Sequence, residues 1–311
     1  MKVLIFGSNG LVGKSCEKVF STSNKATDIF CSTRNDTNLF DFNETKKTIN
    51  KFKPDLIINA AAKVGGILAN NTLRVDFLLE NLKININILE SVIDKPEIKL
   101  INLGSSCIYP LDAKNPIKEE YFMTGKLEPT NSPYALAKIS AIELGDAISK
   151  QYGNQVINLM PTNLYGPYDN FSEDSSHVIP GLIRRMHKSK YENKEKFEIW
   201  GTGKPLREFL YAEDLARCIE YLCDRDLEHS LINVGSGKEI SIYDLALLIQ
   251  EVVGYEGELS FDSSKPDGNP RKLLDSTRIN SYGWSATTSL ELGLETTYNW
   301  FLENKNKNIK L

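Results

Sequence analysis

Three features of nucleic-acid-binding, membrane or secreted proteins are missing from this sequence. The 37 lysines and arginines form no basic block, and 41 acidic residues give a formal net charge of −4. Because phosphate neutralisation needs a clustered basic face, nucleic acid is not an expected partner. No apolar run approaches the ~20 residues that span a bilayer. The start, MKVLIFGSNG, lacks the longer apolar core of a signal peptide, so we expect no membrane association.

Cysteine is scarce and shows no paired spacing. Five cysteines, an odd number, stand in the chain without a CxxC pair. This argues against a disulfide framework and against a metal site, and it favours a cytoplasmic protein with reduced thiols. We interpret four of the five as small buried hydrophobic residues: Cys16, Cys31, Cys218 and Cys223. Cys107 is different, because it follows two serines at the end of an apolar run.

Strand and helix signals alternate from residue 2 to Pro161. Continuous apolar runs such as KVLIF and IKLINLG indicate strands buried on both faces, and stretches with helical periodicity separate them. Long helices are expected over 70–94 and 132–152. This alternation predicts an α/β fold, a Rossmann-type doubly wound parallel sheet with right-handed crossovers.

A glycine-rich turn follows the first predicted strand. The segment GSNGLVG places Gly7, Gly10 and Gly13 between a strand and a helix. In this context the first glycine makes the tight turn, the second lets the backbone approach a pyrophosphate, and the third allows close helix–sheet packing. The pattern predicts a dinucleotide site at the helix N-terminus. A tight turn in a module that binds no dinucleotide is the alternative.

The end of the second predicted strand bears on the type of cofactor. An NAD enzyme usually carries Asp or Glu there, which holds the ribose hydroxyls. Here the strand ends CSTRND, with neutral residues followed by Arg34. An arginine can pair with a 2′-phosphate, so the sequence favours NADPH over NADH. An ordinary surface arginine is the alternative.

The regular alternation ends after Pro161. The segment TNLYGPYDNFSEDSSH is rich in turn-forming residues, and short strands and helices follow it. We interpret 1–167 as the NADP-binding Rossmann domain, to which 208–240 returns. We assign 168–207 and 241–311 to a smaller α/β substrate domain. Loops as long as this one are usually functional.

A serine, a tyrosine and a lysine have the spacing of carbonyl-reducing enzymes. Tyr134 and Lys138 lie at i and i+4 on one helix face, and Ser105 ends the fourth predicted strand, at the edge where ligands bind. The lysine would hold the nicotinamide ribose and lower the pKa of the tyrosine. The tyrosine would then pass a proton to the carbonyl oxygen. Because a lone YxxxK occurs on many helices, its meaning depends on the glycine turn and Ser105.

Longer segments extend these motifs along the chain. They are AAAKVGGILANN, LGSSCIYP, EPTNSPYALAK, MPTNLYGPYDNF, SHVIP, WGTGKPLREFL and KPDGNPRKLLD. At these segments the chain resembles the GDP-L-fucose synthase family of extended short-chain dehydrogenases/reductases, and the resemblance runs to TYNWFLEN near the C-terminus. It implies an enzyme that epimerises carbons 3 and 5 of GDP-4-keto-6-deoxy-D-mannose. The same enzyme then reduces carbon 4 with NADPH to give GDP-L-fucose.

The resemblance gives a function to the thiol beside Ser105. It implies that Cys107 is the base and His177 the acid of the epimerisation, while Tyr134 and Ser105 stabilise the ketone oxygen in both reactions. A structural cysteine at a strand end is the alternative for Cys107. A capping or core histidine is the alternative for His177, and a helix N-terminus there would disfavour the protonated imidazole that an acid needs.

The remaining site residues are also implied by the resemblance. The cofactor residues are Gly7, Ser8, Asn9, Gly10, Leu11, Val12, Gly13, Arg34, Asn38, Leu39, Leu103, Gly104, Ser105, Ser106, Lys138, Pro161, Thr162, Asn163, Leu164 and His177. The GDP-sugar residues are Arg185, Trp200, Arg207, Asp267 and Lys272. Asn9 departs from the pattern, because relatives often carry a basic residue in the glycine loop. Its absence leaves more of the 2′-phosphate contact to Arg34.

The resemblance also implies a homodimer through the helices 70–94 and 132–152. Their apolar stripes could equally face the sheet alone. Two alternatives for the function stay open. One is the same chemistry, or reduction alone, on a related GDP-4-keto sugar such as a 3,6-dideoxyhexose or a 6-deoxyheptose. The other is a non-catalytic dinucleotide-sensing module, which would tend to lose the Tyr–Lys pair.

Overall fold

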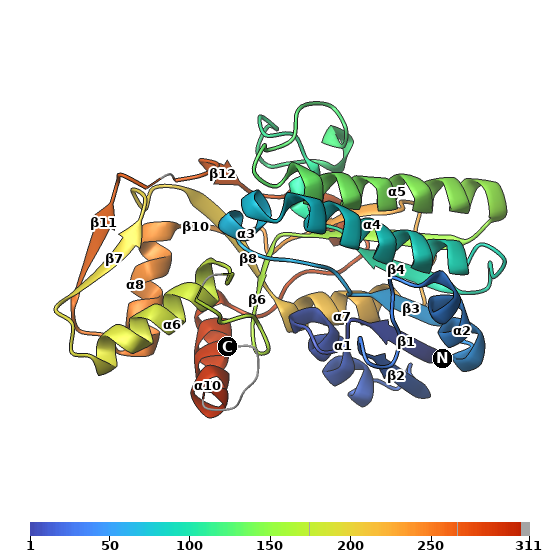
Figure 1. The fold of residues 1–311 in the computed structure, drawn as a ribbon, viewed down its shortest axis with the longest axis horizontal. Coiled ribbons are helices and arrows are strands. Elements are labelled where there is room, and N and C mark those ends of the chain that lie inside the picture. The colour runs from blue at the N-terminus through green and yellow to red at the C-terminus, as the bar shows by residue number, and fades with distance from the viewer. Residues whose placement is uncertain (174, 266, 306–311) are drawn as a thin grey trace.

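Six parallel strands form the central sheet, at the end of the molecule that carries the N-terminus (Figure 1). The computed structural model describes residues 1–173, 175–265 and 267–305. In spatial order the strands are β2 (Asp28–Ser32), β1 (Lys2–Phe6), β3 (Leu56–Asn59), β4 (Lys99–Leu103), β5 (Gln155–Pro161) and β9 (Leu231–Val234). The strand order reverses beside β1, which is where such sheets bind ligands. The expected Rossmann-type parallel sheet is confirmed.

Helices cover both faces of this sheet. Val3 and Ile5 of β1 belong to one hydrophobic core, and Leu4 and Phe6 belong to the core on the opposite face. The first face packs against α1 (Leu11–Thr22), α7 (Ala212–Leu222) and the short α9 (Thr277–Ser281). The second packs against α2 (Phe42–Phe52), α4 (Arg74–Ser91) and α5 (Ser132–Tyr152). Burial on both sides explains why these strands are continuous apolar runs.

The single long helix expected over 70–94 is wrong, because this segment holds a break. The helix α3 (Ile67–Thr72) ends before Leu73, whose backbone is non-helical (φ −103°, ψ 42°), and α4 then ends early, at Ser91. The Thr72 hydroxyl donates to the carbonyl of Leu68 (2.9 Å), a contact that competes with regular helical bonding. The helix expected over 132–152 is confirmed as α5.

Most of the chain beyond β5, apart from α7, β9 and α9, builds a second α/β body with its own core. One sheet contains β6 (Asn163–Tyr165), β8 (Leu206–Tyr211), β10 (Glu239–Ser241) and β12 (Arg271–Lys272), and β7 (Lys196–Trp200) pairs with β11 (Glu258–Asp262). The helices are α6 (Val178–Tyr191), α8 (Ile242–Val253) and α10 (Leu290–Asn304). Short 3-10 turns are η1 (Ser106–Ile108) and η2 (Glu119–Tyr121). Within the described ranges, no helix has both the length and the apolar character needed to cross a membrane.

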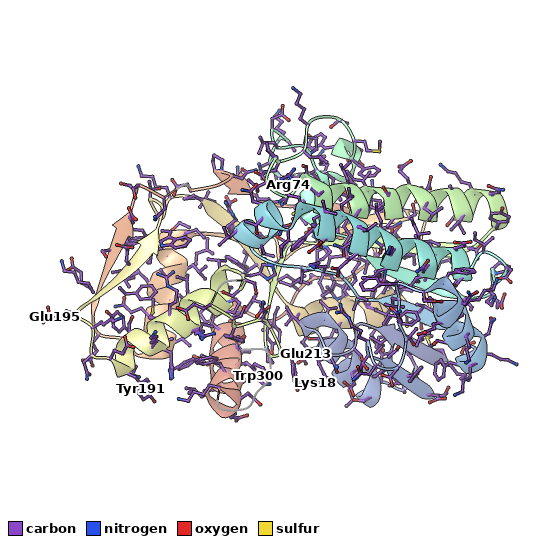
Figure 2. All side chains as sticks on the ribbon, in the orientation of Figure 1. Lys18, Arg74, Tyr191, Glu195, Glu213 and Trp300 are labelled. Atoms are coloured by element: carbon purple, nitrogen blue, oxygen red, sulfur yellow. The ribbon has the colours of Figure 1, made fainter. Side chains whose placement is uncertain are left out.

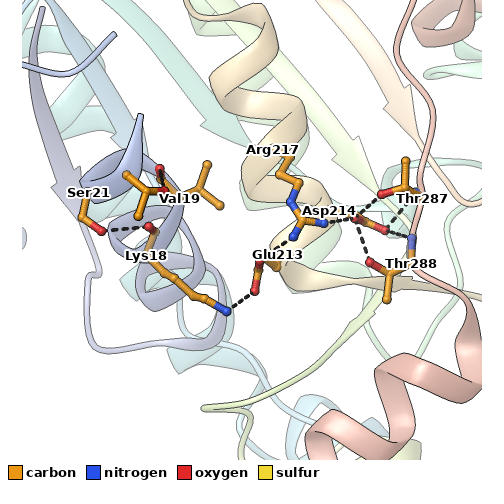
Figure 3. A network of polar contacts seen from close by, with 9 residues as sticks. Lys18, Val19, Ser21, Glu213, Asp214, Arg217, Thr287 and Thr288 are labelled. Atoms are coloured by element: carbon orange, nitrogen blue, oxygen red, sulfur yellow. Dashed lines mark hydrogen bonds and ion pairs between the residues drawn. The ribbon is translucent and has the colours of Figure 1, made fainter. Parts of the chain in front are cut away.

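A buried carboxylate links the two bodies. Asp214 of α7 is 1% exposed and accepts hydrogen bonds from the backbone N–H groups of Thr287 (3.2 Å) and Thr288 (2.8 Å), just before α10. Arg217 also donates to it, and Lys18 of α1 extends the network through Glu213 (Figure 3). The C-terminal segment is therefore anchored to the helical layer of the first body.

The domain boundaries stay a prediction. From the segment 208–240, α7 and β9 lie in the first body, as expected, whereas Phe209 packs in the core of the second. Ile279 and Trp284, placed by the sequence in the substrate domain, pack in the core of the first body. The last residues of the predicted domain, 306–311, lie outside the described part of the chain.

Three asparagines form a buried ladder across the central sheet. Asn59, Asn102 and Asn158 occupy paired positions on β3, β4 and β5. The amide of Asn59 donates to Asn102 (2.9 Å), and the amide of Asn102 donates to Asn158 (3.0 Å). These bonds fix the register of the strands whose ends carry the site described below, since a slipped register would leave buried amides unpaired.

Asn102→Ala should lower the free energy of unfolding by about 1–3 kcal/mol, because the buried Asn158 side chain loses the donor to its oxygen and Asn59 is left with Asn85 as the only acceptor for its NH2 group. Urea denaturation measures the change, and Asn35→Ala at an exposed position is the control. An equal, small effect of both substitutions would contradict the structural role of the ladder.

Candidate active site

The glycine turn closes tightly between β1 and α1. Gly7 has φ +77°, and a Cβ there would lie 2.7 Å from the Ala61 backbone. A Cβ on Gly13 would lie 2.3 Å from the carbonyl oxygen of Gly7. Gly10 is the N-cap of α1 and makes no side-chain capping bond, so the N–H groups at the helix start are available to an anion. The shape of this turn fits a dinucleotide pyrophosphate.

A cation, not a carboxylate, is available at the end of β2. Arg34 is exposed, and its guanidinium lies 5.7 Å from the centre of the Phe40 ring. Asp36 is folded back onto Thr33, accepting from its N–H (2.8 Å) and its hydroxyl (2.6 Å), and these bonds lower the pKa of Asp36. The Ser8 hydroxyl in the adjacent turn is buried and unpaired.

The expected Ser, Tyr and Lys meet at the carboxyl end of β4. The Ser105 side chain lies close enough to the Tyr134 phenol to act on its pKa, and Lys138 donates to the carbonyl of Leu103 (2.7 Å). Lys138 is 2% exposed, and burial lowers its pKa to about 8. Burial, followed by the nearby Cys107, raises the pKa of Tyr134, and the Ser105 side chain opposes this rise. The expected lowering of the Tyr134 pKa is therefore not found, because burial outweighs the other effects.

The start of α5, which carries Tyr134, is held from α4. Arg74 donates to the carbonyls of Pro129 (2.9 Å) and Thr130 (3.3 Å) and to the Ser132 hydroxyl (3.2 Å). Figure 2 shows Arg74 where the two helices begin side by side. Sequence reasoning did not find this contact, because a surface arginine at a helix start carries no distinguishing signal.

Cys107 lies beside the Tyr–Ser pair and contacts two donors. Its sulfur accepts a hydrogen bond from the Asn131 side chain (3.4 Å) and another from the Lys272 ammonium (3.7 Å). Its backbone N–H donates to the Ser105 hydroxyl (3.3 Å). The structure thus brings Ser105, Cys107 and Tyr134 together and adds Lys272, which was expected to contact the GDP-sugar.

His177 occupies the N-cap of α6, with Asp169 behind it. The Nδ1 atom of His177 lies 4.0 Å from the Asp169 carboxylate, and Asp169 is buried with one oxygen unpaired. A carboxylate so placed can orient the imidazole ring. Among the described residues, no hydrogen bond or ion pair joins His177 to Cys107 or Tyr134. Asp169 was missed, although it stands in the turn-rich segment before His177.

The residues expected at the sugar nucleotide lie on the second body, where Arg207 is opposite Lys272 in the pairing of β8 with β12. Trp200 is 62% exposed at the end of β7. Asp267 accepts from the Thr202 N–H (2.6 Å) and hydroxyl (2.8 Å), and it lines a cavity of about 130 Å³ with Lys204, Pro205, Gly268 and Pro270. Arg207 donates to the carbonyl of Leu206 (2.8 Å), and Arg185 donates to the carbonyl of Glu198 and packs on Phe197.

The other expected cofactor residues cluster at the carboxyl edge of the sheet. The turn after β4 meets the end of β5, where the N–H of Gly104 donates to the Leu159 carbonyl (2.9 Å). Thr162 and Asn163 donate to the backbone carbonyl of Glu208 (3.2 and 2.8 Å). This edge is next to the glycine turn, as a single extended ligand would require.

Comparison with known proteins agrees with this geometry. Residues 3–235 match the NAD dependent epimerase/dehydratase family. The chain is 46% identical over 303 residues to a GDP-L-fucose synthase of Sinorhizobium fredii, covering 97% of this chain and 96% of that protein. It is 39% identical to a GDP-L-colitose synthase of Yersinia pseudotuberculosis, over 98% of this chain and 99% of the relative.

Solved structures show the same fold over the whole chain. A GDP-L-fucose synthetase from Naegleria fowleri bound to NADP superposes with a TM-score of 0.91 at 30% identity, covering 100% of this chain and 96% of that one. A GDP-6-OMe-4-keto-L-xylo-heptose reductase from C. jejuni gives a TM-score of 0.89 at 31% identity, with 97% of each chain covered.

The burial of Lys138 makes stability depend on pH. Because its pKa falls from 10.5 to about 8 on folding, the unfolded chain binds this proton more tightly, and the wild type should gain stability between these pH values. Relative to Lys138→Met, the gain in unfolding free energy should be roughly 3 kcal/mol or less. Urea denaturation of both proteins at about pH 7 and about pH 10 measures it. If the difference in unfolding free energy between the wild type and Lys138→Met were the same at both pH values, Lys138 would have the same pKa in the folded and unfolded chain.

The segment resemblance seen in the sequence is confirmed by these full-length matches, and the chain therefore belongs to the NAD dependent epimerase/dehydratase family of enzymes, as a relative of the GDP-L-fucose synthases.

Proposed function

We propose that this protein is a GDP-L-fucose synthase, which epimerises carbons 3 and 5 of GDP-4-keto-6-deoxy-D-mannose and reduces carbon 4 with NADPH. The observation that carries the proposal is the position of Cys107 beside both Tyr134 and Ser105. A reductase alone needs the pair and not the thiol. The near-full-length similarity to GDP-L-fucose synthases supports the same substrate.

The Tyr134–Ser105 pair serves both reactions through one oxygen. Two hydroxyl donors on the ketone oxygen stabilise the negative charge that develops there when a proton leaves a neighbouring carbon. They stabilise the same charge when the ketone is reduced, and Tyr134 then supplies the proton that completes the new hydroxyl. Lys138 contributes a positive charge on the same helix face.

Epimerisation requires a base and an acid on opposite faces of the sugar. In this proposal Cys107 removes the proton next to the ketone and His177 returns one on the other face. Removal is feasible because the carbon–hydrogen electron pair moves onto the ketone oxygen. Asp169 supports His177 by holding its ring and by balancing the charge of the protonated imidazole.

The residues around the glycine turn fit NADPH. A side chain at Gly7 or Gly13 would fill the turn that the pyrophosphate needs, and the hydroxyl of Ser8 is buried without a partner. Arg34 would pair with the 2′-phosphate, and Lys138 would hold the nicotinamide ribose. When bound, NADPH supplies the hydride for the reduction. NADP is the ligand of the related Naegleria structure.

The sugar nucleotide would bind along the second body. Trp200 offers a flat exposed face, Arg185 and Arg207 can pair with the diphosphate, and Asp267 with Lys272 completes the set inferred from the resemblance. The identity of the sugar depends on few contacts, each worth about 1–3 kcal/mol. The same chemistry on a related GDP-4-keto sugar is therefore the second candidate, favoured by the similarity to the colitose synthase.

The test is an assay with GDP-4-keto-6-deoxy-D-mannose and NADPH. The absorbance of the reduced cofactor reports reduction, and NMR of the product identifies GDP-L-fucose. The 3-deoxy analogue, assayed in parallel, should be the poorer substrate by kcat/KM. A higher kcat/KM for the analogue would show that the proposed substrate is wrong. A product that is reduced at carbon 4 but not inverted at carbons 3 and 5 would show that the proposed epimerase activity is wrong.

Tyr134→Phe should lower the rate of reduction by at least about a hundredfold, because the proton donor is lost. Solvent deuterium should still enter carbons 3 and 5 of the sugar, since Ser105 and Cys107 remain. Cys107→Ser is the matched variant and should lose deuterium entry instead. Unchanged reduction by Tyr134→Phe would contradict the role of the phenol.

We also propose a homodimer through α4 and α5, in the cytoplasm. Val75, Leu79 and Ile86 form an outward stripe on α4 and are 72%, 48% and 42% exposed, and Leu136 on α5 is 47% exposed. An exposed apolar stripe on two adjacent helices is typical of an interaction surface. The five free cysteines support a reducing compartment, which stays a prediction.

Leu79→Arg should weaken the dimer by at least about thirtyfold, because it places a charge in the apolar stripe. Sedimentation velocity over a concentration series measures the change. Leu292→Arg, at a leucine of α10 that is 56% exposed, should leave the dimer intact. A wild type that sediments as a monomer throughout would reject this interface.

A further inference from the structure

We propose that Lys272 is a positioning residue for Cys107: its ammonium binds the sulfur and orients it for removal of the sugar proton. This inference deepens the proposed function and rests on it. It assigns Lys272 a task at the reacting thiol, where the resemblance implied contact with the GDP-sugar.

The contact is specific. The Nζ atom of Lys272 lies 3.7 Å from the Cys107 sulfur, and the Asn131 amide donates to the same sulfur from 3.4 Å. Both groups are donors, so both favour a negatively charged acceptor. Tyr134 is the other titratable group that interacts with this sulfur. Burial raises the pKa of Tyr134 and keeps the phenol neutral, so the ammonium of Lys272 is the positively charged group among these partners of the sulfur.

The fold fixes the backbone around Lys272 on both sides. β12 pairs with β8 so that Lys272 lies opposite Arg207. The next two N–H groups are held by side chains, Leu273 by Asn115 (2.8 Å) and Leu274 by Glu208 (3.0 Å). Glu208 is fully buried, and burial raises its pKa. These hydrogen bonds fix the backbone beside Lys272, so its side chain extends to the Cys107 sulfur from a defined position.

The chemical consequence concerns the first step of epimerisation. The thiolate takes a proton from carbon 3 or carbon 5, an S–H bond forms, and the carbon–hydrogen electron pair becomes the enolate at carbon 4. Lys272 keeps all its protons in this step, while the Cys107 sulfur beside it changes from a charged thiolate to a neutral thiol. A positive charge within 4 Å attracts the negative charge that a sulfur carries when it acts as a base, so Lys272 holds the sulfur in place for this step.

The experiment measures alkylation of Cys107 by iodoacetamide in the purified full chain without substrate, read for each cysteine by peptide mass spectrometry. Lys272→Met should slow alkylation of Cys107 by about tenfold or more at neutral pH. Lys272→Arg should restore most of the rate, because it restores the charge. Lys114→Met, at an exposed lysine, is the control and should match the wild type.

Cys31 is an internal reference in the same samples. The sequence led us to expect it to be buried, but it is half-buried, and burial raises its pKa to about 11. Its alkylation should be slow and equal in all variants. A faster alkylation of Cys31 in Lys272→Met would show that this substitution loosens the fold. The alkylation rate of Cys107 would then be compared between the folded variants Lys272→Arg and Lys272→Gln, which differ in charge.

Equal alkylation of Cys107 in the wild type, Lys272→Met and Lys272→Gln would overturn the proposal. A larger KM for the GDP-sugar with an unchanged kcat would also overturn it, because that result assigns Lys272 to substrate binding. Failure of the proposed function looks different: the wild type would then incorporate no solvent deuterium into the sugar, while the alkylation rates would still depend on Lys272.

Discussion

The placement of Tyr134 beside Ser105 is the constraint on which the rest of the site depends. It sets the first turn of α5 against the turn after β4, and it defines the place where a carbonyl oxygen can accept two donors. The Lys138 ammonium fastens α5 to β4 through the Leu103 carbonyl (2.7 Å). Arg74 holds the start of α5 from the side of α4. Without these fixed distances, the thiol of Cys107 would have no defined relation to a bound ketone.

The second body turns a reductase-like centre into one suited to two reactions. The first body supplies the glycine turn and the Ser, Tyr and Lys residues. Lys272 and His177 come from segments beyond β5, and each lies beside a partner: Lys272 contacts the Cys107 sulfur, and His177 lies 4.0 Å from the Asp169 carboxylate. The buried Asp214 network keeps the segment before α10 on α7. The relative position of the bodies therefore decides the chemistry.

The sequence allowed the sheet, the glycine turn and the Ser105–Tyr134–Lys138 arrangement to be predicted, because each depends on local periodicity or on the ends of parallel strands. It could not predict contacts between distant side chains. Cys107 and Lys272 are 165 positions apart, and their meeting depends on the register of β12 against β8. The sequence also did not predict the break at Leu73, because the hydrogen bond from the Thr72 hydroxyl to the Leu68 carbonyl leaves no periodic pattern. It did not predict that the pKa of Tyr134 is raised, because the burial of one side chain leaves no such pattern either. The functions of the individual site residues stay predictions.

The central claim is that one oxygen site serves inversion at two carbons and reduction at a third. NMR of the sugar formed from GDP-4-keto-6-deoxy-D-mannose and NADPH in heavy water tests it in a single spectrum. The account predicts deuterium at carbons 3 and 5, both inverted, and cofactor-derived protium at carbon 4. A reduced sugar that keeps protium and its original configuration at carbons 3 and 5 would contradict it.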